Sequence, residues 1–567
     1  MKPQTDRGRL VTLIALIEAQ PLAREFLIFL SFTLLTTVMT WPWITSLRNA
    51  AVDPGDPYLI SWILWWDYHQ TFHDPIHLFN ANIFYPLTKT LAFTENDYGI
   101  ALLFFPLFAL GVHPLTVNSI ATFLGFALCG YGAYRLTRTL TGSSGAAWIA
   151  GIIFAFLPYR FHLLSQLHYV FSGWLPLQLE ALVLFARVRS WKRAIWFAVA
   201  FTMNALSCLT WFMLALTPLV ITTAFYILRF QLHRDRNFWL RGGVVMSAAT
   251  VVLLPFLLPY YQVSKTYGFT WGRAVVEKNS ATVRHWLMAE YRTRVWKGFG
   301  DGVPGGNYRL FPGLLPILLG VAAVIIPSRL ITEPSQSDHK RSSWVTLLDL
   351  VVVVALTIAL VAWGWSGVAA SPSVFAILTV DRVILVAVVA VVVRWLLCYP
   401  QIIKRATGQE SLAESIQATK HESLWIGLIW TITGFLMSLG MNSWLFRVLF
   451  DFVFLFRGMR EPSRAAMIAC LGLALLGGIG ATKLAGAVAK RLPLKKYVVV
   501  SFVALALLFE LHATPLKFIH GADRPDELAK RLKVTPMRGG LVELPSGGGE
   551  LPHLYMLRSA DHAKPLI

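Results

Sequence analysis

The sequence predicts an all-α, polytopic membrane protein, and three observations lead to that fold class. Of the 567 residues, 56% are hydrophobic and only 14% are charged, and the mean hydropathy is +0.58. A soluble protein of several domains is much less apolar. Apolar runs long enough to cross a hydrocarbon core of about 30 Å recur along the chain, and helices satisfy their own backbone there. The short alternating segments of a transmembrane β-barrel are not seen.

The positive charge of the chain points to membrane topology rather than to nucleic acid. The formal net charge is +20, but Arg and Lys lie in short clusters between the apolar runs, as expected where charge sets orientation. We therefore expect no nucleic-acid partner. The four cysteines, Cys129, Cys208, Cys398 and Cys470, fall in or beside apolar runs, which predicts core packing rather than disulfides or metal ligation. No small-residue cleavage site follows a short apolar core near the N-terminus, so no removable signal peptide is predicted.

Threading the basic clusters onto the cytoplasmic face gives about 13 crossings. Residues 1–24 then form a cytoplasmic N-terminus, residues 25–512 the membrane domain, and residues 513–567 an extracytoplasmic tail. The expected spans are residues 25–47, 114–134, 146–157, a segment ending at Arg187, a pair within 194–228, a segment ending near 259, and residues 310–326, 344–366, 375–398, 423–440, 463–486 and 497–512.

Two long polar loops are predicted on the outer face, at about residues 48–113 and 260–309. Residues 99–110 are apolar, but a crossing there would place Arg135 and Arg138 outside. We therefore expect this piece to lie against the outer surface. Residues 58–68 carry Trp62, Trp65 and Trp66, which favour headgroup depth. The first loop is thus predicted to contain interfacial helices.

The first loop also carries carboxylates that could do chemistry. Asp53 and Asp56 lie in Asp-Pro-Gly-Asp-Pro, directly after the first span, and the prolines give them a stiff, non-helical backbone. Such a backbone can present a carboxylate to a substrate at the membrane surface. The alternative is a turn whose Asp side chains cap the following helix.

Cationic side chains are predicted on the same face. An anionic, lipid-linked substrate needs cations for its phosphate and a base for its acceptor. Each cation taken singly also fits an interfacial anchor or an ion-pair partner. The candidates for binding the donor and its phosphate are Arg160, His162, His168, Arg273, Arg460 and Arg464.

A divalent cation is a further candidate. Oxygen ligands from Asp56, Glu95 and Asp97 would suit Mg²⁺ or Mn²⁺. His162 and His168 are six residues apart and do not share a helix face, and no His-x-x-x-His or Cys-x-x-Cys motif lies in a suitable place. No P-loop, dinucleotide fingerprint or Gly-x-Ser-x-Gly elbow occurs.

Several motifs, taken in order, resemble those of a large set of bacterial multi-pass proteins. The resemblance is to the GT-C superfamily of integral membrane glycosyltransferases, alongside protein O-mannosyltransferases and aminoarabinose transferases, and it extends along most of the chain. The motifs are Asp-Pro-x-Asp-Pro from Asp53, Leu-Phe-Asn-Ala-Asn-Ile-Phe-Tyr-Pro from Leu78, Phe-Leu-Pro-Tyr-Arg ending at Arg160, Leu-Phe-Pro-Gly-Leu-Leu-Pro from Leu310 and Glu-Leu-Pro from Glu543.

The resemblance implies transfer of a sugar from a polyprenyl-phosphate donor to a lipid, glycan or protein acceptor at the outer face of a bacterial inner membrane, with inversion. It implies that Asp53 is the base. An acidic pair that such enzymes use near the next outer segment is missing here, where Arg160, His162 and His168 stand, which weakens the case for a metal. Relatives are expected to continue past Ile567, which predicts a truncated form.

Two other functions fit the same loops. One is a transporter or flippase for a lipid-linked sugar, although such proteins place ionisable residues near the midplane and carry repeated halves. Here Asp and Glu avoid the centres of the predicted spans, and no inverted repeat is found. The other is a non-enzymatic partner in polysaccharide assembly.

Overall fold

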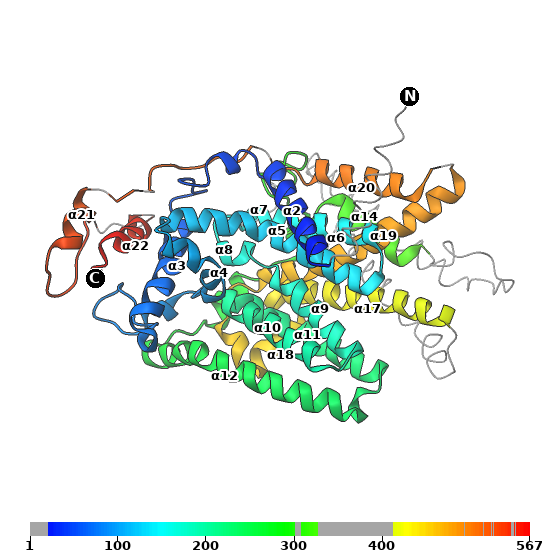
Figure 1. Ribbon diagram of the computed structural model, residues 1–567, viewed down its shortest axis with the longest axis horizontal. Coiled ribbons are helices and arrows are strands. Elements are labelled where there is room, and N and C mark those ends of the chain that lie inside the picture. The colour runs from blue at the N-terminus through cyan, green and yellow to red at the C-terminus, as the bar shows by residue number, and fades with distance from the viewer. Residues whose placement is uncertain are drawn as a thin grey trace, which may run out of the picture.

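The computed structural model describes residues 21–300, 308–326, 412–492, 494–513, 515–522, 524–525, 527–545, 549 and 551–567, with backbone alone for residues 412–420. Cys398 and the spans expected at residues 344–366 and 375–398 lie outside these ranges. The described chain is helical and contains isolated β-bridges but no strand. The protein is an all-α polytopic membrane protein, as predicted (Figure 1).

Seven helical segments within the described ranges are long and apolar enough to cross a membrane. They agree with the expected spans to within several residues. In chain order they are α2 (Pro21–Met39), α5 (Pro114–Thr141), α6 with α7 (Ser144–Phe156, Pro158–His162), α8 with α9 (Leu167–Val170, Trp174–Arg187), α11 (Leu209–Arg229), α12 (Arg236–Tyr267), and α19 (Ala466–Arg491) with the turn Pro462–Ala465 before it.

Further helices complete the bundle and its loops. Four of them match predicted spans although they are shorter or less apolar: α10 (Trp191–Ser207), α14 (Leu314–Ile325), α17 (Leu412–Ser438) and α20 (Lys496–Glu510). The others are α3 (Asp56–His73), α4 (Tyr98–Ala109), α13 (Arg273–Lys278), α18 (Trp444–Phe452), α21 (Glu527–Val534) and α22 (Leu551–His562).

Local sequence fixes the turn between α5 and α6. Pro114 occupies the first turn of α5, where its missing N–H costs nothing. The helix ends at Gly142, whose φ of 67° lies in the left-handed region that glycine adopts without strain. Ser143 then caps α6 by accepting a hydrogen bond from the backbone of Ala146. Two long helices therefore run antiparallel across the bundle.

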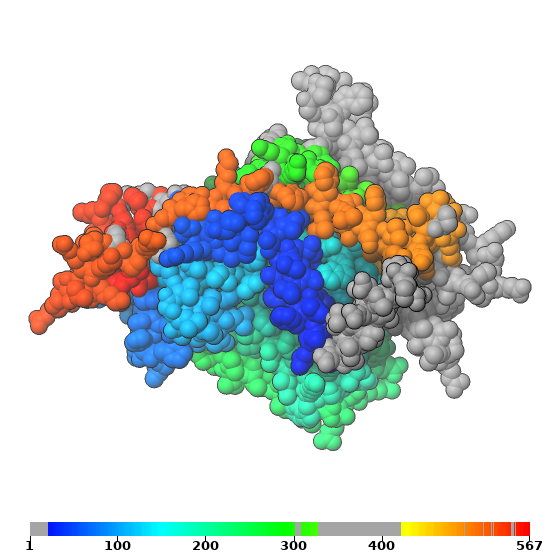
Figure 2. Space-filling model, turned by 45° about the horizontal axis from the view of Figure 1, so that its top comes forward, coloured from blue at the N-terminus to red at the C-terminus, as the bar shows by residue number. Residues whose placement is uncertain are grey.

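The bundle has a protein core and a lipid-facing rim. In an apolar 18-residue stretch of each segment, 89% of the residues are buried for α19 and for α8–α9, against 22% for α2 and for α12. α19 packs closely on α17, since a Cβ at Gly434 would lie 2.2 Å from the backbone nitrogen of Ala469. Leu22 and Phe26 of α2 are largely exposed, as expected for side chains facing lipid. Figure 2 shows α2 on the surface of the molecule.

The helices of the first loop are covered by protein. Trp62 and Trp66 of α3 are 0% and 6% exposed, and their indole N–H groups donate to Asn82 and to the carbonyl of Leu78. These two rings are therefore covered by protein, and the headgroup depth of α3 stays a prediction. Tryptophan also suits a buried site that offers its N–H a partner, and composition alone does not separate the two environments.

The C-terminal tail supplies part of that cover. α22 packs on α3 (Figure 1), and Leu566 exchanges backbone hydrogen bonds with Asn82 and Tyr85. Ala51 and Ile519 form an isolated antiparallel bridge. The tail therefore lies on the same face of the bundle as the first loop, as the odd number of predicted crossings requires. That this face is the outer one stays a prediction.

Candidate functional site

Asp53 is held at the end of the chain segment that follows α2. One carboxylate oxygen accepts from the backbone N–H of Gly55 at 2.9 Å, and the other accepts from the hydroxyl of Ser165. The first contact forms the Asp turn that the sequence offered as the alternative to a functional role. The second joins Asp53 to a segment 112 residues away. The carboxylate is partly buried, and so it does not point into bulk solvent.

Asp56 contacts the same distant segment. It lies in the first turn of α3, where a negative charge is favourable, and accepts from the side-chain amide of Gln166 at 2.8 Å. Ser165 and Gln166 connect α7 to α8. Both predicted acids of the first loop are thus oriented by the turn that follows the third span.

A third carboxylate, Glu290, reaches this turn from the second loop. It is fully buried, bonds Nδ1 of His162 at 3.0 Å and pairs with Arg292 at 3.1 Å. Arg292 also donates to the carbonyl of Phe161 at 3.2 Å. We call Asp53, Asp56, His162, Glu290 and Arg292 the carboxylate cluster.

The sequence analysis missed Glu290 and Arg292. They lie inside a long loop, and His162 is 128 residues away from Glu290. The available signal was the position itself: a carboxylate flanked by Ala289 and Tyr291, beside Arg292, on the face assigned to Asp53. Glu290 also supplies an acid beside His162, where the sequence offered none nearby.

Tyr291 connects the two sides of the cluster electrostatically. Burial raises the pKa of its phenol most, and the negative charges of Glu290 and Asp53 add to that rise, while Arg292 opposes it. The guanidinium of Arg292 lies over the Tyr291 ring, 4.5 Å from its centre. Asp53 is therefore within electrostatic range of Tyr291 as well as bonded to Ser165.

Arg160 does not reach the cluster. The side chain is fully buried and donates to the carbonyls of Phe154 and Val170, to the hydroxyl of Ser172 and to the sulfur of Met467. The predicted phosphate-binding role does not fit this environment, since every nitrogen of the guanidinium already donates to the protein. These hydrogen bonds give Arg160 a structural role in α7, the short helix between α6 and α8.

Replacing Arg160 by Gln should therefore destabilise the fold. The buried carbonyl of Phe154 would lose its guanidinium donors at roughly 1–3 kcal/mol, whereas that of Val170 keeps the backbone N–H of Ser172. We therefore expect a fall of about 2 kcal/mol in the free energy of unfolding, read from thermal unfolding in detergent. Arg273→Gln is the control, because Arg273 is exposed and its nearest ion-pair atom, on Asp451, is 3.7 Å away. An Arg160→Gln protein of normal stability that has lost donor binding would restore the phosphate role.

Arg460 and Arg464 flank a carboxylate of their own. Arg460 is exposed, pairs with Glu461 at 2.9 Å and lies over the ring of Trp271. Arg464 pairs with the other oxygen of Glu461 at 2.8 Å and lies 4.1 Å from the centre of the Tyr169 ring. Arg464 also lies within electrostatic range of His168. Several of the predicted phosphate binders therefore lie near one another, but only His162 belongs to the carboxylate cluster.

The remaining predicted acids are used inside the protein. Glu95 accepts from the backbone N–H groups of Leu209 and Thr210 at 2.6 and 3.0 Å, which places its charge at the positive end of α11. Asp97 is buried against Nδ1 of His168 at 3.2 Å. Burial also raises the pKa of Asp97, against the opposing influence of His168. Asp56, Glu95 and Asp97 therefore have three different hydrogen-bond partners, although the charge of Glu95 also acts on Asp97.

Asp67 makes stability depend on pH. Burial, and then the charge of Asp97, raise the pKa of Asp67 well above its usual value, and neither oxygen has a hydrogen-bond partner among the described residues. The folded chain holds this proton at a higher pH than the unfolded chain does. Stability is therefore highest below the unfolded pKa of about 3.9 and falls as pH rises through the folded pKa.

Asp67→Asn should remove this fall, because an amide carries no charge to bury. We expect the variant to have a flatter profile of melting temperature against pH and to melt above the wild type at pH 8. Asp74→Asn, at an exposed acid paired with His77, should follow the wild type. A variant that melts below the wild type at every pH would show that the Asp67 carboxylate is stabilising.

The predicted metal site does not fit the structure. Among the described residues, no group of three or more His, Cys, Asp or Glu side chains is placed to hold an ion. Mg²⁺ and Mn²⁺ need several oxygen ligands at once, and Asp56, Glu95 and Asp97 do not converge. Cys129, Cys208 and Cys470 are buried free thiols, as expected.

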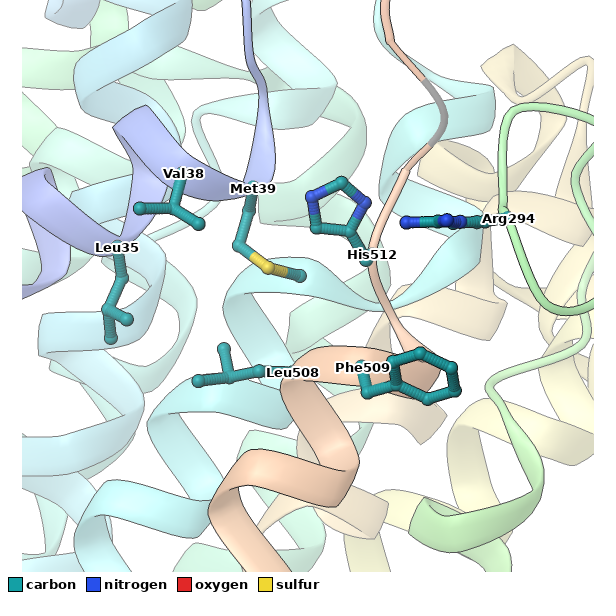
Figure 3. A pocket seen from close by; sticks show the side chains of 7 residues that line it. All are labelled: Leu35, Val38, Met39, Arg294, Leu508, Phe509 and His512. Carbon is teal, nitrogen blue, oxygen red and sulfur yellow. The ribbon is translucent and has the colours of Figure 1, made fainter.

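A crevice between α2 and α20 is lined by a residue of the loop that carries Glu290 and Arg292. Its volume is about 210 Å³, and Leu35, Val38 and Met39 of α2 line it together with Leu508 and Phe509 of α20. Arg294 and His512 form its polar end, and Figure 3 shows the His512 ring between Met39 and the Arg294 guanidinium. Arg294 is two residues from Arg292, and its backbone donates to the carbonyl of His512.

Solved structures resemble this chain, whereas family models and curated sequences do not. No protein-family model matches the chain, and no curated protein is similar to it in sequence. The chain is similar to the oligosaccharyltransferase of Archaeoglobus fulgidus, in its apo form, with 14% identity and a TM-score of 0.42. The match covers 96% of this chain and 61% of that protein.

Proposed function

We propose that this protein is a membrane glycosyltransferase of the GT-C type, which transfers a sugar from a polyprenyl-phosphate donor to an acceptor hydroxyl at the outer face of a bacterial inner membrane. The observation that carries the proposal is the carboxylate cluster. Asp53 is bonded to Ser165 in the turn after α7, and His162 at the end of α7 is bonded to Glu290, which pairs with Arg292. Arg294, two residues further on, lines a crevice with an apolar floor.

Asp53 is the proposed base. Its oxygens accept from Gly55 and Ser165, which fixes the carboxylate while leaving lone pairs for an incoming hydroxyl. The acceptor proton passes to Asp53 as the acceptor oxygen forms a bond to the anomeric carbon. The bond from that carbon to the phosphate oxygen breaks, and its electron pair leaves with the polyprenyl phosphate. A single displacement of this kind inverts the configuration.

The departing phosphate needs cations rather than a proton. Arg292 and Arg294 are the proposed partners, because both come from the loop that carries Glu290, and Arg294 opens onto the crevice. The polyprenyl chain would lie along α2 and α20, whose outer faces are apolar and exposed. These two residues take the phosphate-binding role that the sequence had suggested for Arg160. The acceptor class, whether lipid, glycan or protein, is left open by the cluster.

The proposal is tested in sealed vesicles that contain the purified full chain and a radiolabelled polyprenyl-phosphate sugar. We expect the label to leave the polyprenyl lipid and to appear on an added membrane acceptor fraction. Movement of intact labelled lipid between the leaflets, with the sugar–phosphate bond unbroken, would identify a flippase. If neither sugar transfer nor lipid movement is seen, the non-enzymatic assembly partner is favoured. The flippase result and this result would each overturn the proposal.

A further inference from the structure

A second cavity lies at the other end of the bundle and takes no part in the proposed reaction. Its volume is about 560 Å³, and it is formed where α2 begins, α5 ends and α6 begins, against α9. Its polar lining consists chiefly of Arg24, Glu25, Arg135, Arg138 and Glu180. A cavity of this size accommodates a small-molecule headgroup.

The length of α5 places this cavity across the membrane from the carboxylate cluster. Near its first turn, Asn118 and Ser119 donate to the carbonyls of Pro57 and Ala50 in the Asp53 segment. Arg138 follows Ser119 by nineteen residues in the same helix, which is about 28 Å at roughly 1.5 Å per residue. The hydrocarbon core is about 30 Å thick. The cavity therefore lies at the headgroup level of the opposite leaflet.

One cation of the cavity has no ion-pair partner among the residues that the structure describes. Glu25 pairs with Arg24 at 3.0 Å, and Arg135 pairs with Glu180 at 3.0 Å. Arg138 is exposed and makes no ion pair with any residue in the described ranges. Ser144, in the first turn of α6, also lines the cavity, so the positive end of a 13-residue helix faces the same space.

Glu180 supplies an acceptor beside that cation. The residue is 2% exposed, and one of its oxygens accepts from Arg135 and from Thr139. The other oxygen is buried and has no hydrogen-bond partner within the described part of the chain. A buried carboxylate oxygen without a donor is costly, and a hydroxyl-bearing ligand would satisfy it.

One wall of the cavity is apolar. It includes Ile28, Tyr134 and Trp148, and Trp148 stacks on Phe32 with ring centres 4.9 Å apart. Partly exposed tryptophan at this depth is typical of the membrane interface. The neighbouring face of α2 carries Leu22 and Phe26, both exposed. An occupant could therefore enter from the bilayer with its chains still in lipid.

We propose that this cavity binds the headgroup of an anionic phospholipid whose phosphate is esterified to a hydroxyl-bearing alcohol. The phosphate lies against Arg138 and the first turn of α6, and the headgroup hydroxyl donates to the unpartnered oxygen of Glu180. Basic pockets between membrane helices recognise anionic headgroups in this way. Phosphatidylglycerol has both features, whereas phosphatidylcholine has neither the net charge nor the hydroxyl.

The experiment measures thermal unfolding of the purified full chain in detergent, titrated with phosphatidylglycerol, phosphatidylcholine or inorganic phosphate. We expect phosphatidylglycerol alone to raise the melting temperature. Arg138→Gln should weaken its apparent affinity about fivefold, which is the gain expected from one basic residue at an anionic headgroup. Arg138→Lys should retain most of the affinity. Arg234→Gln, at an exposed arginine beyond the end of α11, is the matched control and should behave as the wild type.

Each other outcome rejects the site. Equal stabilisation by phosphatidylcholine would mean a general lipid effect. An equal loss in Arg234→Gln would mean a diffuse surface charge. An Arg138-dependent shift with inorganic phosphate would mean a free-anion site. The two sites are tested independently. An Asp53→Asn protein that has lost sugar transfer should still give the wild-type lipid titration.

Discussion

Asp53→Asn should reduce sugar transfer by about 10²- to 10⁴-fold, the range that general-base catalysis supplies. Asparagine keeps the shape of the side chain, and its amide oxygen can still accept from Gly55 or Ser165. What it loses is the ability to take a proton from the acceptor hydroxyl. The measurement is turnover of a polyprenyl-phosphate sugar by purified protein at saturating donor.

The matched control is Asp74→Asn, in the same loop. Asp74 lies at the end of α3 and pairs with His77 on the surface, so its replacement should change turnover by less than about twofold, as surface changes away from a site usually do. Insertion and melting temperature should be normal in both variants. An Asp53→Asn protein with turnover close to that of Asp74→Asn would remove Asp53 from the chemistry.

Glu290→Gln should lower both stability and turnover. Glu290 is fully buried between His162 and Arg292, and removing one partner of a buried pair leaves an uncompensated charge at a cost of about 3–5 kcal/mol. Both partners are partly exposed, with 28% and 20% of their side chains accessible, so the lower end of that range applies. Arg292 would also lose the partner that holds it near the donor phosphate.

Two readouts separate the structural effect from the catalytic one. Melting temperature in detergent reports the first, and turnover per folded protein at a temperature well below melting reports the second. Glu277→Gln, at an exposed acid in the same loop, should change neither. If Glu290→Gln is destabilised but each folded molecule turns over at the wild-type rate, Glu290 is only a packing residue of the second loop.

The helices were predictable from the sequence because their signal is local. Apolar length and flanking charge predict a span, and α5, α6 and α19 lie close to where the pattern put them. The environment of a polar side chain is not local. Arg160 and Arg460 look alike in a sequence, but the first is enclosed by four acceptor groups and the second lies open at the surface.

The site was predictable only in part for the same reason. Asp53 and Asp56 were found because proline and glycine mark their turn, and His162 because it follows a span end. Glu290 joins them through contacts over more than a hundred residues, which no spacing rule anticipates. Glu95 looked like a ligand but caps α11, because a carboxylate serves the N–H groups of a helix end as well as it serves a metal ion.

The most direct test is the fraction of labelled sugar that leaves a polyprenyl-phosphate donor when the purified chain is supplied with membrane acceptors. The account predicts time-dependent loss of label from the donor, an equal gain in an acceptor product of inverted anomeric configuration, and neither change with Asp53→Asn. Label that remains wholly on the polyprenyl lipid with the wild-type protein, over a range of donor sugars, would contradict it.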